Sequence, residues 1–120
     1  MIILAVAVIA LAGPPAGAIP LVRAVSPAVG AEIAAGKIQI KVTFDQPMRA
    51  SWSFVMRDPA SYPDCAKTPV QSADGRTFTL DCTVEAGKDY WIGFNSERFK
   101  GFQSLDGVAA KPAMVRFSAH

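Results

Sequence analysis

Few residues in this sequence could do chemistry. The single histidine, His120, is the last residue, and a nucleophile cannot rely on a base at a frayed terminus. Several aspartates lie near predicted turns, where capping is their ordinary role, and none forms the D-x-D-x-D run of a calcium loop. These aspartates are Asp45, Asp58, Asp64, Asp74 and Asp106. We therefore expect no enzymatic activity, no cofactor and no metal site.

The two cysteines, Cys65 and Cys82, are the remaining reactive side chains. Cys65 lies in the proline-rich segment 59–69, and Cys82 falls on the inward side of a predicted strand. In an exported chain such a pair usually forms a disulfide, which would stabilise the fold by roughly 3 kcal/mol. The alternative is two free thiols. A C-x-x-C redox motif is absent, and Trp52 precedes both cysteines, unlike the tryptophan of an antibody framework.

The N-terminal segment indicates the cellular compartment in which the protein is found. The chain of 120 residues is 51% hydrophobic, and the excess is concentrated in residues 1–18, which carry no charged side chain. Its apolar run, residues 2–12, is shorter than the roughly 20 residues of a membrane span but suits the core of a secretory signal. Two prolines and then Ala16-Gly17-Ala18 supply a helix break and a cleavage pattern. We expect a signal peptide over 1–18, and an exported domain over 19–120, periplasmic or extracellular, without a membrane span. The alternative is a buried N-terminal element.

Alternation of polar and apolar residues predicts strands in the rest of the chain. It is clearest over residues 37–44, 77–84 and 90–94, with a shorter set at 115–117. Weaker candidates are 21–25 and 52–56. Turn signals separate these runs at Asp74-Gly75, Ala86-Gly87 and Asp106-Gly107. About seven short strands in about 100 residues predict one all-β domain, an antiparallel β-sandwich.

Some aromatic residues are expected to face outward, and Trp91 is the clearest because it alternates with Tyr90 and Ile92. Tryptophan, tyrosine and arginine most often anchor interfaces. The alternative is that these aromatic side chains only cover an edge or plug an open end of the sandwich. The candidate interaction surface comprises Trp52, Trp91, Arg98, Phe99 and Phe102.

Several short motifs occur in the order of a known domain family. Ser26-Pro27 and Gly30 precede a strand that ends in Phe44-Asp45-Gln46-Pro47-Met48, and residues 84–90 read V-E-A-G-K-D-Y. With the closing hairpin, this pattern resembles bacterial Ig-like domains of the SbsA type over nearly all of 21–119. The resemblance implies an Ig-like Greek-key topology and a non-catalytic structural or interaction module of the bacterial envelope or extracellular space. The partner it implies is an envelope protein or polysaccharide.

The same N-terminal pattern, residues 21–30 and 43–48, also resembles the CopC family of periplasmic copper carriers. That family binds Cu(II) through an N-terminal histidine and later histidine and aspartate ligands. Here the expected first residue is Ile19 and no internal histidine exists, so that ligand set is not carried over. The methionines that could bind Cu(I) are not clustered in sequence. They are Met48, Met56 and Met114. A CopC-related metal-handling protein that lacks the usual ligands is the alternative function.

The distribution of charge argues against one class of partner, nucleic acid. The 12 basic and 10 acidic residues are interleaved and give a net charge of +2. A nucleic-acid footprint would be a basic stripe, so we expect no nucleic-acid partner. The slight basic excess favours at most weak contact with anionic envelope polymers.

Overall fold

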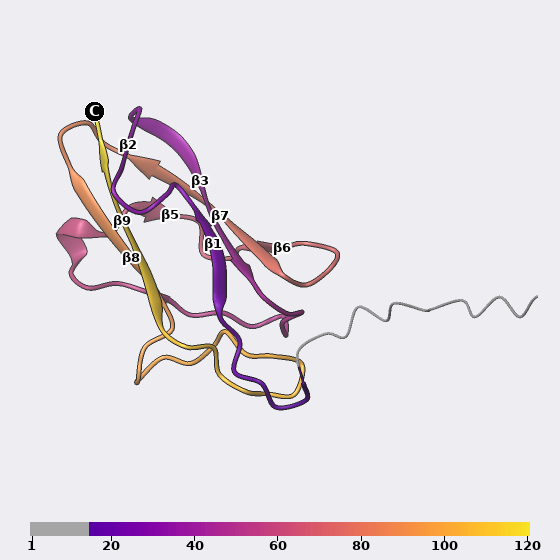
Figure 1. Ribbon diagram of the computed structural model, residues 1–120. Helices are drawn as coiled ribbons and strands as arrows, with labels where there is room; N and C mark the ends of the chain where they lie inside the picture. The colour runs from indigo at the N-terminus through magenta and orange to yellow at the C-terminus, as the bar shows by residue number, and fades with distance from the viewer. Residues whose placement is uncertain (1–14) are drawn as a thin grey trace, which may run out of the picture.

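The computed structural model describes residues 15–120, which form two packed β-sheets (Figure 1). The apolar run 2–12 falls outside the described residues, so the expected signal peptide is not tested. In chain order the elements are β1 (Val22–Ser26), β2 (Ala31–Ile33), β3 (Gly36–Phe44), β4 (Phe54–Val55), the 3-10 helix η1 (Pro59–Ser61), β5 (Asp64–Cys65), β6 (Val70–Gln71), β7 (Thr77–Val84), β8 (Asp89–Phe94) and β9 (Ala113–Ala119).

The first sheet has the order β1-β3-β7-β5, with β6 also paired to β7, and the second has the order β2-β9-β8-β4. This division of strands is that of Ig-type sandwiches, so the predicted Ig-like β-sandwich is confirmed. One detail corrects the antiparallel expectation, because β2 pairs with β9 in parallel. The chain reaches β2 by leaving the first sheet after β1, through Pro27 and a glycine turn at Gly30.

The strands with clear alternation were predicted and the shortest ones were not. The four clear patterns correspond to β3, β7, β8 and β9, and the two weaker ones to β1 and β4. No sequence pattern indicated β2, β5 or β6, which have three, two and two residues. Alternation cannot be recognised over so few residues, so the count of about seven strands was too low. Cys65, expected in a loop, lies in β5.

The core lies between the sheets and is rich in phenylalanine. Phe44 and Phe78 of the first sheet meet Phe94 of the second around Phe102, whose ring centroid is 5.0 Å from that of Phe44 and 5.1 Å from that of Phe78. All four side chains are almost completely buried. Edge-to-face aromatic contacts of this kind add to the stabilisation that comes from buried apolar area.

Tyr90, at the start of β8, fixes the connection that enters the second sheet. Its ring is buried and stacks on Phe117 at 5.5 Å, while its hydroxyl oxygen accepts a hydrogen bond of 2.8 Å from the backbone N–H of Glu85. This is the tyrosine corner of Ig-type sandwiches. The connection turns at Gly87, whose φ of 82° suits glycine.

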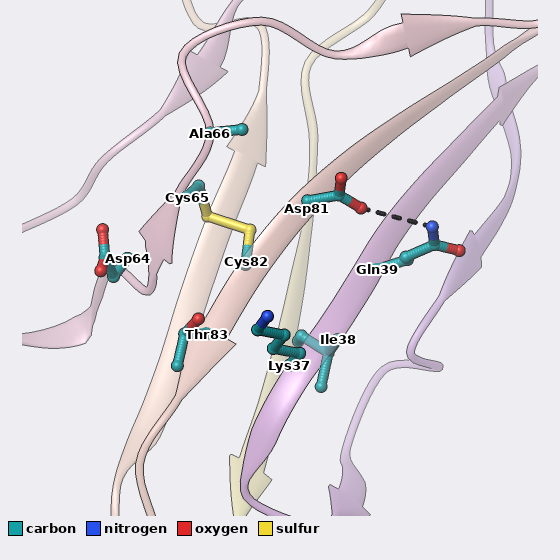
Figure 2. A pocket seen from close by; sticks show the side chains of 9 residues that line it. All are labelled: Lys37, Ile38, Gln39, Asp64, Cys65, Ala66, Asp81, Cys82 and Thr83. Atoms are coloured by element: carbon teal, nitrogen blue, oxygen red, sulfur yellow. Dashed lines mark hydrogen bonds between the residues drawn. A yellow bond between two sulfur atoms is a disulfide. The ribbon is translucent and has the colours of Figure 1, made fainter.

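The predicted disulfide is present. Cys65 of β5 lies directly opposite Cys82 of β7, and their sulfur atoms are bonded (Figure 2). It therefore joins neighbouring strands of one sheet, unlike the bridge between sheets of antibody domains. Because β5 has only two residues, this bond attaches the segment after η1 to the edge of the first sheet.

Residues on both sides of Ile19 contact the rest of the sandwich. Pro20 is buried, and its carbonyl oxygen accepts a hydrogen bond from the backbone of Lys111. The backbone N–H of Leu21 donates to Asp45, and the Gln46 amide donates to the Ala18 carbonyl at 3.1 Å. Within residues 15–120, no helix has the length and hydropathy needed to cross a bilayer.

Candidate functional site

The outer face of the second sheet carries a tryptophan between two arginines. Trp91 of β8 pairs across the sheet with Arg116 of β9. On its other side, Val55 of β4 pairs with Gly93, and Arg57 follows in the bend two residues after β4 ends. The contact is present, because the Arg57 guanidinium carbon lies 5.6 Å from the centre of the indole ring. We call Arg57, Trp91 and Arg116 the arginine–tryptophan row.

Because Gly93 has no side chain, there is space beside it for the indole of Trp91. A Cβ atom placed on Gly93 would lie 2.9 Å from Cη2 of Trp91 and 3.0 Å from Cβ of Val55. The benzene end of the indole therefore extends over Gly93, where any larger residue would displace it. The ring is only half-buried, and Arg57 lies over it. An arginine stacked on an aromatic ring keeps its N–H groups free for other partners.

A hollow of about 340 Å³ adjoins the row. It is lined by the three residues of the row together with Gly30, Asp89 and Ser118, among others. Gly30 borders it because its backbone N–H donates to the Arg116 carbonyl at 2.7 Å. The hollow thus lies between the tryptophan and a strand edge where a glycine leaves space.

Asp58 is the acidic residue that pairs with Arg57 of the row. Its carboxylate lies 3.5 Å from Nε of Arg57, and both side chains are about half exposed, at 47% and 58%. Hydrogen bonds from the hydroxyl and the backbone N–H of Ser61, more than the charge of Arg57, hold the pKa of Asp58 below its usual value. Asp58 is therefore ionised at neutral pH and offsets part of the charge of Arg57, but an exposed pair of this kind is weak.

The other expected surface residues lie apart from the row. Trp52 precedes β4 and is 37% exposed, beside a separate hollow that it lines with Phe54 and Tyr62. Partial burial raises the pKa of Tyr62. Phe99 is 50% exposed, and the guanidinium carbon of Arg98 lies 5.4 Å from its ring centre.

Phe102 was wrongly assigned to the surface. Its side chain is 0% exposed and lies within the phenylalanine core. The reason is Asn95, a buried residue with a φ of 63°, whose amide nitrogen donates to the carbonyl oxygens of Phe102 and Ala110. Its amide oxygen accepts from the Phe102 backbone N–H at 2.9 Å. Asn95 thus fixes both polar groups of the Phe102 backbone and directs the ring inward.

Gly101 explains why this loop lies so close to the chain before β4. A Cβ atom on Gly101 would collide with the Trp52 carbonyl. The Gly101 backbone instead bonds with the hydroxyl groups of Ser51 and Ser53, at 2.6 and 2.7 Å. Asn95 and Gly101 could not be recognised from the sequence, because only tertiary contacts give them a role. Arg57 and Arg116 could not be recognised either, because only the folded sheet brings them to Trp91.

A larger hollow, of about 630 Å³, adjoins the disulfide on the first sheet (Figure 2). Figure 2 shows it bordered by Lys37 and Gln39 of β3, with the Gln39 amide donating to Asp81 at 3.3 Å. No aromatic ring lines it, and its polar side chains partly satisfy one another. Unlike the hollow beside the row, its lining contains neither an aromatic residue nor an arginine.

Metal-ligating groups are not gathered in the part of the chain that the structure describes. Within residues 15–120, no three histidine, cysteine or acidic side chains lie together. Met48, one of the three methionines considered for Cu(I), is part of the core. Met56, by contrast, is exposed after β4.

Comparison with solved structures gives a likeness over most of the chain. A crystal structure of the S-layer protein SbsC matches 84% of this chain with a TM-score of 0.53 and 22% identity. A structure of surface layer protein SbsC, domains 1-6, matches 85% with the same TM-score and identity. The chain spans only 14% of either protein. No protein-family model and no curated protein matches the chain.

At this identity the likeness shows the fold alone. The structural neighbours are parts of SbsC and not of SbsA, so the SbsA type is not specifically supported. What the structure shows is the broader statement, an Ig-like β-sandwich of the kind found within an S-layer protein.

Proposed function

We propose that the chain is an exported, non-catalytic Ig-like module with a structural or binding role in the bacterial cell envelope or extracellular space. The observation that carries the proposal is the Cys65–Cys82 disulfide, which attaches a two-residue strand to a sandwich like those of an S-layer protein. Disulfides persist in oxidising compartments, so this bond supports a site of action outside the cytoplasm. The apolar, uncharged leader supports the same location.

Export is tested by expressing the full chain with a C-terminal tag in a bacterial host and separating the cell fractions. We expect a shortened chain outside the cytoplasm, two hydrogens lighter than the same chain after reduction. The matched control carries Val6→Asp and Val8→Asp, which interrupt the apolar run and should leave a full-length chain in the cytoplasm. A wild-type chain of full-length mass with free thiols in the cytoplasm would overturn the proposal.

The copper-handling alternative has no observation in its favour beyond the N-terminal resemblance. It remains testable by titrating the purified, exported chain with Cu(I) under a competing chelator. A tight complex of one copper per chain would replace the proposal of a structural or binding module.

A further inference from the structure

We propose that the arginine–tryptophan row binds a polysaccharide whose sugars carry carboxylate groups, that is, a polymer of uronic acids. The inference rests on the proposed function, because only an exported module meets envelope polysaccharides. It adds the site, the ligand class and the role of each residue. Trp91 is the platform, and Arg57 and Arg116 bind carboxylate.

The guanidinium groups are placed for this role. A planar guanidinium can donate two parallel hydrogen bonds to one carboxylate, which makes arginine the usual partner for such groups. Arg57 is held in place on the indole of Trp91, so less side-chain freedom is lost when a ligand binds. Among residues 15–120 the ion pairs are Arg57–Asp58 and Glu85–Lys88, so Arg116 has no acidic partner there.

The spacing lets one short stretch of polymer meet both arginines. Arg116 lies on β9 opposite Trp91, and Arg57 lies just after the end of β4 with its guanidinium over the indole, so the two arginines are on either side of Trp91. The hollow beside the row is bordered by Asp89 and Ser118, which can bond sugar hydroxyl groups. A sugar ring can then lie over the half-buried Trp91 while its carboxylate meets an arginine.

The size of the row favours this ligand over a protein partner. A stable protein partner needs about 800 Å² of contact on each side, with apolar anchors at its centre. Around the row the sheet instead presents the exposed acidic residues Glu32 and Asp89. With Asp58 they bring three carboxylates to a face that carries two arginines, so the ligand is held by its bonds to the guanidinium groups and not by a positive field, which disfavours the higher charge of a phosphomonoester.

The test uses the full chain, purified after expression, with polygalacturonate as the probe. Trp52→Phe is introduced throughout, so that Trp91 is the only tryptophan and its fluorescence reports on the row. We expect polygalacturonate to change this fluorescence, and neutral dextran to have no effect. Arg57→Gln and Arg116→Gln should each weaken binding about tenfold, as expected for a lost charge-assisted hydrogen bond.

The matched control is Arg23→Gln, which removes the same charge from an exposed arginine of β1 in the first sheet. We expect it to change the affinity less than twofold at physiological ionic strength. Equal losses in Arg23→Gln and Arg116→Gln would overturn the proposal, because net charge and not the row would then be responsible. Tighter binding of poly-glutamate than of polygalacturonate, or no binding of polygalacturonate, would also overturn it.

Ligand binding by the row and export of the chain are tested independently of one another. Binding is measured on purified protein, so its loss leaves the location of the chain unaffected, and a cytoplasmic chain can still bind the probe. Melting temperatures within a few degrees of wild type show that each variant is folded. Both arginines are exposed, so their replacement should meet this condition.

Discussion

The outer face of the first sheet is a ladder of polar side chains without an aromatic ring, whereas that of the second carries a large ring between two arginines. On the first, the hydroxyl groups of Thr43 and Thr77 lie 2.9 Å apart, and Gln39 donates to Asp81. On the second, Gly93 leaves space that Trp91 fills. Both faces come from strands with the same alternation, so exposure alone does not distinguish a solvated face from a binding face. The difference lies in which side chains meet across the strands.

The two sheets also hold their irregular segments by different means. The segment with η1 and β5 is attached to the first sheet by a covalent bond, Cys65–Cys82. The loop after β8 is held against the second sheet by the buried amide of Asn95 and by the ring of Phe102. Covalent and non-covalent attachment predict different responses to mutation and to reductant.

The largest expected effect is at Phe102. Phe102→Ala should lower the free energy of unfolding by about 4 kcal/mol, because it leaves a cavity among the core phenylalanines. Phe99→Ala, in the same loop but half exposed, is the matched control and should cost less than about 0.5 kcal/mol. Urea unfolding measures both. Similar losses in the two variants would mean that the loop is not anchored through Phe102.

Removal of the disulfide should lower the free energy of unfolding somewhat less than Phe102→Ala does. Cys65→Ala with Cys82→Ala should lower the free energy of unfolding by about 3 kcal/mol, because a closed loop with a sequence separation of 17 is released in the unfolded chain. The unfolding midpoint of the wild type should fall similarly in reductant, while that of the double variant should not change. A midpoint of the wild type that is insensitive to reductant would contradict the role assigned to this bond.

A smaller effect tests whether Gly93 makes room for Trp91. Gly93→Ala should cost about 2 kcal/mol in the wild type, because its Cβ would lie too close to the indole. In a Trp91→Ala background the same change should cost less, limited by the remaining contact with Val55. A double-mutant cycle should give a coupling of about 1 kcal/mol. Additive losses would show that the indole does not occupy this space.

The smallest expected effect is that of acid on Asp74, in the turn between β6 and β7 of the first sheet. Hydrogen bonds from Ser72 and the backbone of Arg76 hold the pKa of Asp74 below its usual value, as those from Ser61 do for Asp58. A lowered pKa means that the stabilisation is complete above the usual value of about 4 and is lost as pH falls through the lowered one. The melting temperature of Asp74→Asn should therefore fall less than that of the wild type when the pH decreases below about 4.

The control for this measurement is Asp64→Asn, which replaces an exposed aspartate of β5 that makes no side-chain hydrogen bond in the described part of the chain. It should follow the wild type over the same pH range. Parallel melting curves for the wild type and Asp74→Asn would show that the bonds around Asp74 do not stabilise the fold.

Prediction from the sequence succeeded where a pattern was long or a residue type was rare. Alternation over eight residues identified β7, and the presence of only two cysteines made their pairing a simple hypothesis. Trp91 was placed on the outer face by the same alternation. Phe102 was misplaced because the loop containing it has no period, so its direction depends on tertiary contacts, chiefly the hydrogen bonds with Asn95.

The sequence by itself determined the class of fold, the cysteine pair and the outward position of Trp91, because alternation and composition are local properties of the chain. Tertiary structure alone decided which residues surround Trp91 and which aromatic ring fills the core. Arg57 and Arg116 are far from one another in sequence and reach Trp91 only through the register of β4, β8 and β9. Register is set by hydrogen bonds between strands and by packing of the core, and a single sequence records neither.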